Sequence, residues 1–274
     1  MDVTLLGTGN PIPDPARAGA ATLVRAGDAR LLFDCGRGVV MRLAAAGVFP
    51  SQLRAVFLTH LHSDHLTDLN DVVTTHWVMN PVPTSLPLFG PPRTDEVVAG
   101  MLAMIRPDVE YRRAHHADLT WDPEVHLEVV ADGFSVDLDG VRVVAAATDH
   151  RPVEPTVGYR VEHRGAVVAI AGDTVPCEGL DRLCAGADVY VQTVLREDMV
   201  RAIPAPRLLD TLDYHSTVEQ AAQTAKRAGV RRLVLTHFVP GCPPGQADEW
   251  AALASAHFDG EIVVADDLTT VSTD

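Results

Sequence analysis

Short apolar runs separated by turn-forming residues recur along the whole chain, and their length is what most limits the possible folds. Runs of about four to eight apolar residues are typical of strands and too short for core helices. Several are apolar throughout, as strands covered on both faces require. The expected strands are Val3–Leu6, Ala21–Arg25, Leu31–Phe33, Ala55–Leu58, Leu86–Phe89, Val125–Val130, Val141–Ala147, Val157–Val161, Val167–Ile170, Val189–Val191, Leu233–Leu235 and Ile262–Val264.

Longer stretches with helical periodicity alternate with these runs. Thr217 is followed three residues later by Gln220, a capping-box pattern, and Gly229 suits the C-terminal end of the same helix. Strands that alternate with helices predict sheets covered by helices, an α/β arrangement, and a shared strand–helix rhythm hints at two related halves. The expected helices are Gly38–Ala46, His65–Met79, Asp95–Ile105, Thr217–Ala228 and Ala247–His257.

The chain length of 274 residues fits one large domain, 1–274, although length alone does not exclude two. The Pro-rich stretches Pro81–Pro92 and Pro240–Pro244 are interpreted as loops within this domain. The charged stretch Pro107–Trp121 is expected to be an irregular surface segment or lid.

The charge of the chain bears on its partners. Lys and Arg total 22 against 37 Asp and Glu, which gives a formal net charge of −15. An acidic surface repels phosphate backbones, so nucleic acid is disfavoured as a partner unless positive charge is locally segregated. The expected partner is therefore a small-molecule substrate, with a homodimer left open. No apolar run is long enough to span a membrane and no signal peptide is evident, so we expect a cytoplasmic location.

The run His60-Leu61-His62-Ser63-Asp64-His65 follows the apolar stretch Ala55–Thr59 and so emerges at the end of an expected buried strand. In extended backbone His60 and His62 point the same way, because side chains alternate with period two. Asp64 and His65 lie where the chain turns into a helix and can face a second point. Imidazole and carboxylate groups suit zinc and related divalent metals. The run therefore predicts two adjacent metal sites.

Six residues cannot complete two sites, so further ligands must come from elsewhere. Four candidates lie at element boundaries: His150, Asp173 and His237 follow expected strands, and His215 precedes an expected helix. Each alone is a weak signal, but together they are consistent with one shared rim.

The order of these motifs resembles the metallo-β-lactamase fold superfamily, and within it the ribonuclease Z-like branch. The resemblance covers nearly the whole chain and rests on His60-Leu-His-Ser-Asp-His65, Asp149-His150, Gly172-Asp173-Thr174, His215-Ser-Thr and Leu235-Thr-His237-Phe, with support from Leu-Leu-Gly-Thr-Gly near the start and Leu32-Phe-Asp-Cys-Gly36. It implies a four-layer αββα sandwich with both metals at one sheet edge.

The resemblance also implies a role for each motif residue. His60, His62 and His150 would hold the first metal, and Asp64, His65 and His237 the second. Asp173 would bridge them, and His215 would be a catalytic histidine beside the metals. The expected cofactor is a pair of divalent ions, with zinc favoured over manganese or iron.

Two departures from the family pattern matter. Members that process tRNA carry a long arm between the equivalents of His150 and Asp173, whereas only 22 residues separate them here and read as two strands joined by a hairpin. The tRNA-binding arm is absent from its usual place. In addition, Tyr190-Val-Gln192-Thr193 stands where relatives often have a His-Glu pair, which removes an acidic partner for His215.

A metal pair lowers the pKa of a bridging water and clamps the attacked group. Asp64 is expected to orient the resulting bridging hydroxide or take its proton, and His215 to assist the leaving oxygen. This chemistry predicts a hydrolase of a small phosphodiester or related ester. Lactonase or aryl sulfatase activity, tRNA 3′-end endonuclease activity, and a diiron redox protein on the same fold remain alternatives, because fold does not select among them.

Several other residues carry weaker signals. His115 and His116 are interpreted as surface groups. His76 and Trp77 either line the pocket or pack in the core. Cys242 lies near His237 in sequence, but a free cysteine is most often a buried hydrophobic residue. The four cysteines, Cys35, Cys177, Cys184 and Cys242, form no C-x-x-C pair and read as reduced thiols.

Overall fold

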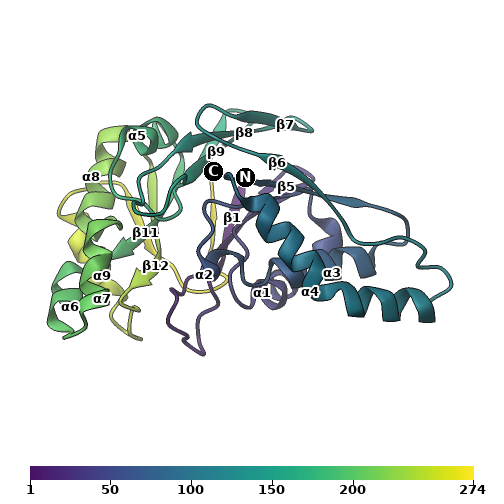
Figure 1. Cartoon of the computed structure of the whole chain (residues 1–274). Helices are drawn as coiled ribbons and strands as arrows, with labels where there is room; N and C mark the ends of the chain where they lie inside the picture. The colour runs from purple at the N-terminus through teal and green to yellow at the C-terminus, as the bar shows by residue number, and fades with distance from the viewer.

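The computed structural model describes residues 1–274, and its strands form two seven-stranded mixed sheets that pack face to face (Figure 1). In spatial order the first sheet contains β14 (Thr270–Ser272), β1 (Asp2–Gly7), β2 (Ala21–Ala26), β3 (Ala29–Phe33), β4 (Ala55–Phe57), β5 (Ser85–Gly90) and β6 (Glu124–Val129). The second contains β13 (Glu261–Val264), β12 (Arg232–Val239), β11 (Val189–Leu195), β10 (Ala166–Ile170), β9 (Val157–His163), β8 (Val141–Ala147) and β7 (Ser135–Leu138).

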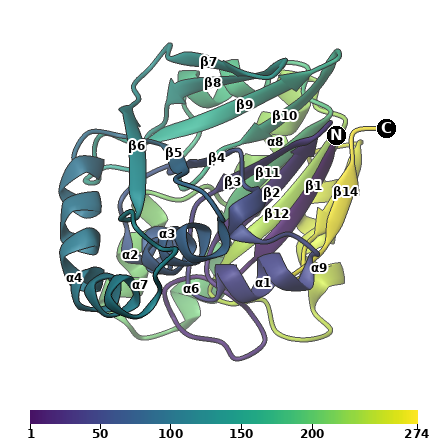
Figure 2. The same ribbon diagram turned by 90° about the vertical axis from the view of Figure 1, so that its right-hand side faces the viewer.

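Helices cover the outer face of each sheet, with the first group on the right and the second on the left of Figure 1. The helices of the first sheet are α1 (Val39–Ala45), α2 (Ser63–Leu66), α3 (Leu69–Met79) and α4 (Thr94–His115), with the 3₁₀ turn η1 at Pro50–Gln52. Those of the second sheet are α5 (Glu178–Cys184), α6 (Glu197–Ala202), α7 (Pro206–Leu209), α8 (Val218–Ala228) and α9 (Ala247–Ser255), with the 3₁₀ turn η2 at Asp210–Asp213. Figure 2 shows the same layers from the side of the first group. The expected αββα sandwich is confirmed.

The core lies in three layers, one between the sheets and one between each sheet and its helices. Aromatic rings fill the middle layer, where Phe57 stacks on Phe33 and Phe89 with ring centroids 4.9 and 4.7 Å apart. Tyr159 contacts the same stack from the second sheet and donates its hydroxyl to the carbonyl of Leu58 over 2.7 Å. This contact joins the two sheets directly beneath the segment that begins at Thr59.

Strand direction gathers the candidate residues at one edge. β3, β4 and β5 are parallel, as are β10, β11 and β12. β8 runs in the direction of β10, because each is antiparallel to β9. The carboxyl ends of strands from both sheets therefore meet at the same edge of the sandwich, where ligand-binding residues are commonly found in α/β folds.

Most expected elements are present with shifted ends, and the hairpin of β9 and β10 is confirmed. Thr217 and Gln220 form the expected capping box of α8, and Gly229 ends that helix with φ 67°. The expected helix His65–Met79 is instead two helices, α2 and α3. Strands β7 and β14 and helices α5 to α7 had no clear periodic signal.

The interpretation of Pro107–Trp121 as irregular is wrong for its first part, because α4 continues through Pro107 to His115. Met101, Ile105 and Val109 recur every fourth residue and are buried, the last two against Trp77. Pro107 falls on the exposed side of this helix. Continued packing of the apolar face outweighs the backbone hydrogen bond that the proline removes.

No helix of this chain has both the length and the apolar character needed to cross a bilayer. The expectation that residues 1–274 fold as one domain stays a prediction.

Candidate metal centre

A short segment after β4 supplies residues to two neighbouring groups of ligand-type side chains. His62 has extended backbone with φ −65° and ψ 144° and directly precedes α2, whose first turn contains Asp64. Asp64 and His65 lie in α2, so the chain turns into a helix where the sequence predicted it. His60, Asp64 and His65 are buried, and His62 is half-buried.

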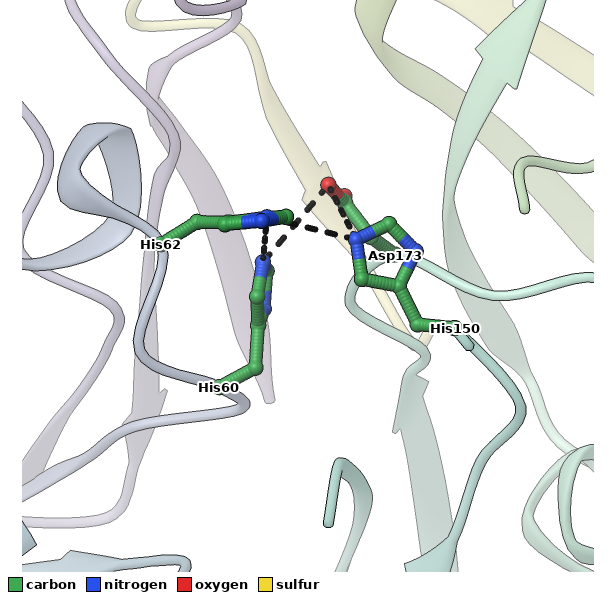
Figure 3. A group of neighbouring side chains, drawn as sticks. All are labelled: His60, His62, His150 and Asp173. Atoms are coloured by element: carbon green, nitrogen blue, oxygen red, sulfur yellow. Dashed lines mark hydrogen bonds and ion pairs between the residues drawn. The ribbon is translucent and has the colours of Figure 1, made fainter. Parts of the chain in front are cut away.

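The first group contains His60, His62, His150 and Asp173, which point toward one another in Figure 3. His62 Nδ1 lies 3.0 Å from His60 Nε2 and 3.3 Å from His150 Nε2, so three ring nitrogens converge. Ligands about 2.0–2.1 Å from a tetrahedral zinc ion lie about 3.3 Å from each other. The spacing of the three nitrogens is therefore that of ligands around one ion.

The second group contains Asp64, His65 and His237. His237 Nε2 lies 3.0 Å from Asp64 Oδ2, and His65 Nε2 lies 3.6 Å from the same oxygen. Asp173 Oδ2 is 3.4 Å from His65 Nε2 and 3.8 Å from His60 Nε2, so one carboxylate oxygen lies between the two groups. All seven residues that the sequence proposed as ligands are thus brought together.

Asp34 supports one histidine of each group and was not among the predicted site residues. It follows β3 with a left-handed backbone, φ 62°, and is buried. His65 Nδ1–H donates to Asp34 Oδ2 over 2.8 Å. Thr59 donates its hydroxyl to the same oxygen over 2.9 Å and accepts from His60 Nδ1–H over 3.0 Å. These hydrogen bonds place the proton of each ring on Nδ1 and leave Nε2 free to bind a cation.

His150 has a backbone partner in place of a side chain. Its Nδ1–H donates to the carbonyl of Tyr214 over 2.8 Å, which directs Nε2 toward His62. Burial lowers the pKa of His150 to about 4 and the pKa of His60 well below its ordinary value. Both rings are therefore neutral near pH 7, the form that binds metals.

Asp173 is held as a carboxylate. Burial opposes its ionisation, but the neighbouring His237 and His65 hold its pKa well below its usual range. Thr193 donates its hydroxyl to Asp173 Oδ1 over 2.8 Å, and Oδ2 faces the histidines. Thr193 belongs to the segment Tyr190–Thr193, which stands where relatives often have a His-Glu pair.

His215 lies beside the second group. Its Nε2 is 3.2 Å from Asp173 Oδ2, and its Nδ1–H donates to the carbonyl of Thr211 over 3.2 Å. That carbonyl is the partner that replaces the missing acidic residue. Gln192 does not contact His215: it is buried and bonds to the Tyr190 hydroxyl and its neighbouring backbone. Asp173, His215 and His237 also lie close enough to one another to hold a metal ion, so His215 is itself a possible ligand beside His237.

Of the remaining candidates, Trp77 is a core residue, since its indole N–H donates to the carbonyl of Trp121 over 3.0 Å. His76 is buried on the same helix. Cys242 packs with Phe238 and Trp250 in the layer under α8 and α9, as a hydrophobic residue would. His115 and His116 are exposed, as expected.

The donor set of five imidazoles and two carboxylates fits two divalent cations. His65 Nε2 supports this fit: it is buried among the two groups, yet it makes no hydrogen bond to any protein atom. A buried ring nitrogen without a partner is costly unless a cation binds it. The residues present therefore match a site for divalent metal ions.

Comparison with known proteins agrees with this architecture. Residues 29–238 match the family described as Beta-lactamase superfamily domain. Ribonuclease Z from Mycolicibacterium gilvum (strain PYR-GCK) is 56% identical over 273 residues, which cover 99% of this chain and 96% of that relative. The metallo-beta-lactamase fold protein YhfI from Bacillus subtilis has a TM-score of 0.76 at 21% identity over 98% of each chain. The short form of human tRNase Z has a TM-score of 0.71 at 25% identity over 100% of each chain.

These relatives overturn the expectation that nucleic acid is disfavoured as a partner. The name of the Mycolicibacterium relative is that of a ribonuclease, an enzyme that acts on RNA. The absence of the arm does not exclude RNA as a substrate, because the match covers 96% of that relative and leaves little room for a long arm there. The net charge does not exclude RNA either, since it describes the whole chain and RNA meets only one face of it.

A relative named ribonuclease Z shares more than half of the aligned residues over nearly the entire chain, and the converging histidines and carboxylates form a site for divalent cations. The chain therefore belongs to the ribonuclease Z-like branch of the metallo-β-lactamase superfamily and is a metal-dependent hydrolase.

Proposed function

We propose that this protein is a dinuclear, zinc-dependent endonuclease that removes the 3′ trailer from precursor tRNA. The observation that carries the proposal is the 56% identity to ribonuclease Z over 99% of the chain. The proposal replaces hydrolysis of a small phosphodiester as the preferred reading of the sequence.

We assign His60, His62 and His150 to the first ion and Asp64, His65 and His237 to the second, with Asp173 shared between them. The convergence of their ring nitrogens and carboxylate oxygens supports this assignment. Imidazole-rich, partly anionic sites suit zinc, which is why it is preferred over manganese and iron. When bound, the two ions would polarise the scissile phosphate and lower the pKa of the attacking water.

The chain's own residues set the geometry for this chemistry. Asp34 orients His65 directly and His60 through Thr59, and Thr193 fixes the carboxylate plane of Asp173. The Asp64 carboxylate lies next to the reaction centre, where it would orient the attacking water. His215 Nε2 lies 3.2 Å from Asp173 Oδ2. We assign Nε2–H of His215 as the proton donor to the leaving oxygen; the ring keeps its second proton on Nδ1, which bonds to the Thr211 carbonyl, and is neutral after the transfer.

The test is cleavage of a precursor tRNA with a 3′ trailer by the zinc-loaded protein at physiological salt, with the product ends mapped. We expect cleavage at one position, with kcat/KM far above that for bis-(p-nitrophenyl) phosphate. His62→Ala should abolish cleavage, whereas His116→Ala, which removes an exposed histidine outside the site, should retain it.

Efficient hydrolysis of the small diester without specific cleavage of the precursor tRNA would contradict the proposal. Specific cleavage that survives His62→Ala would contradict the assignment of the site instead.

A further inference from the structure

His237 differs from the other candidate ligands in the atom that faces away from the metal centre. The outward ring nitrogens of His60, His65 and His150 each have a protein partner. His62 is half-buried, so its outward nitrogen is not enclosed by the protein. His237 Nδ1, in contrast, is buried and makes no hydrogen bond with the protein. A histidine ligand almost always donates this N–H to a carboxylate, a carbonyl or a water molecule.

A cavity of about 30 Å³ is lined by residues of both sheets, and His237, His65 and Asp34 contribute to its lining. Its lining includes Thr22, Phe33, Ile170, Val191, Thr236 and His237. The hydroxyl of Thr236 is a second buried polar atom without a hydrogen bond. A cavity of at least about 10–15 Å³ with two to four polar neighbours is sufficient for one ordered water.

Three of the polar groups that line the cavity are threonines at the ends of aliphatic strand faces. On β2, Thr22 precedes Val24 on the face that packs between the sheets, and on β12 Thr236 follows Val234 on the same kind of face. Side chains two residues apart share a face of a strand. On these two strands the face between the sheets changes from aliphatic to hydroxyl-bearing side chains where it reaches the cavity. In β11 the equivalent hydroxyl, that of Thr193, is already bonded to Asp173.

His237 also has an unusual backbone. Its φ of 48° is left-handed, and β12 has one residue more than β11 at this point: Thr193 pairs with Thr236, but Leu195 pairs with Val239. This bulge turns the His237 ring toward Asp64. It leaves no neighbouring strand atom in position to accept a hydrogen bond from Nδ1.

We propose that this cavity is a binding site for one structural water molecule, which accepts a hydrogen bond from His237 Nδ1–H and bonds to the hydroxyl of Thr236. Water can accept and donate at once, and a threonine hydroxyl can do either, so all three groups are satisfied. The water keeps the proton on Nδ1 and the lone pair of Nε2 toward the second ion. Thr236 is thus a positioning residue for His237.

This inference rests on the proposed role of His237 as a metal ligand, but not on the identity of the RNA substrate. The first test is a crystal structure of the full-length, zinc-loaded protein at a resolution that shows ordered waters. We expect one density peak about 2.7–3.2 Å from both His237 Nδ1 and Thr236 Oγ1. Zinc bound by His237 with no such peak overturns this inference alone. Absence of zinc at His237 overturns the metal assignment and this inference with it.

The second test measures zinc affinity by competition with a chromophoric chelator. Thr236→Val keeps the shape of the side chain and removes the hydroxyl, and we expect the affinity for one of the two ions to fall roughly 10- to 100-fold. Thr236→Ser, which keeps the hydroxyl, should bind zinc as the wild type does. Thr224→Val is the matched control, because Thr224 is also buried but lies in α8.

Unchanged affinity for both ions in Thr236→Val overturns the positioning role. Should this variant fail to fold, the crystal structure of the zinc-loaded wild type decides, since a missing density peak between His237 and Thr236 overturns the proposal.

Discussion

The hydroxyl of Thr193 donates to Asp173 Oδ1 over 2.8 Å and thereby fixes the plane of the carboxylate whose other oxygen lies between the two groups of histidines. Without this bond the carboxylate can rotate about its own axis. We expect Thr193→Val to weaken zinc binding roughly 10- to 100-fold, as loss of a hydrogen bond to a metal ligand commonly does. Isothermal titration of the metal-free protein measures the effect, and Thr193→Ser should restore it. Equal affinities in the valine and serine variants would rule out this role for the hydroxyl.

Asp34→Asn should weaken both metal sites at once. The carboxylate accepts hydrogen bonds from His65 and from the backbone and hydroxyl of Thr59. An asparagine retains only one acceptor oxygen, so one of these donors is left buried without a partner. We expect fewer than two zinc ions per chain at a zinc concentration that fills both sites of the wild type, and a lower Tm. Asp118→Asn, at an exposed position, is the control. Loss of a single ion with the other affinity unchanged would show that Asp34 supports one site only.

The purified protein should bind two transition-metal ions per chain. Five histidines and two aspartates form two groups that share Asp173. Asp173→Ala should therefore lower the occupancy of both sites and abolish hydrolysis, because removal of the shared oxygen affects both. Elemental analysis after reconstitution with excess zinc gives the stoichiometry. At most one ion per wild-type chain would refute the dinuclear assignment.

His215→Ala should lose hydrolysis and keep both metals. His215 Nε2 contacts Asp173, and its Nδ1 contacts the backbone carbonyl of Thr211. In the proposed assignment neither nitrogen binds a metal ion, so removal of the ring should leave both ions bound. The proximity of His215 to His237 makes this a real test, since the same position would also permit metal ligation. Elemental analysis and single-turnover cleavage on the same preparation decide between the two roles. Loss of one ion in the variant would make His215 a ligand.

The convergence of the proposed ligands could be predicted from sequence, because each follows an apolar strand and strand ends meet at a sheet edge. The groups that orient the ligands could not be predicted in the same way. His65 and Asp34 are 31 positions apart, and their contact depends on how β3 and β4 pair. Tyr214 supports His150 through its carbonyl, an atom that every residue has, so no residue type identifies it. The order in which polar side chains follow strands is visible in the sequence, and the hydrogen bonds across strands are not.

Two expectations were wrong because the sequence feature behind each did not decide the local structure or the local surface. A proline within a charged stretch suggested irregular structure at Pro107, but the buried residues every fourth position decided the outcome. A net charge of −15 suggested that nucleic acid is disfavoured as a partner, but a sum over the chain says nothing about the single face that a substrate meets.

The hydrogen bonds of Asp34 connect His65 of one group with His60 of the other through Thr59. An ion that binds in either group restrains this carboxylate, and the restrained carboxylate in turn holds a histidine of the opposite group in its binding orientation. The first ion has then already ordered side chains of the second site, so the second ion binds with a smaller loss of conformational entropy. The two ions are consequently coupled through the protein, and zinc should load with positive cooperativity, the singly occupied species remaining scarce throughout a titration.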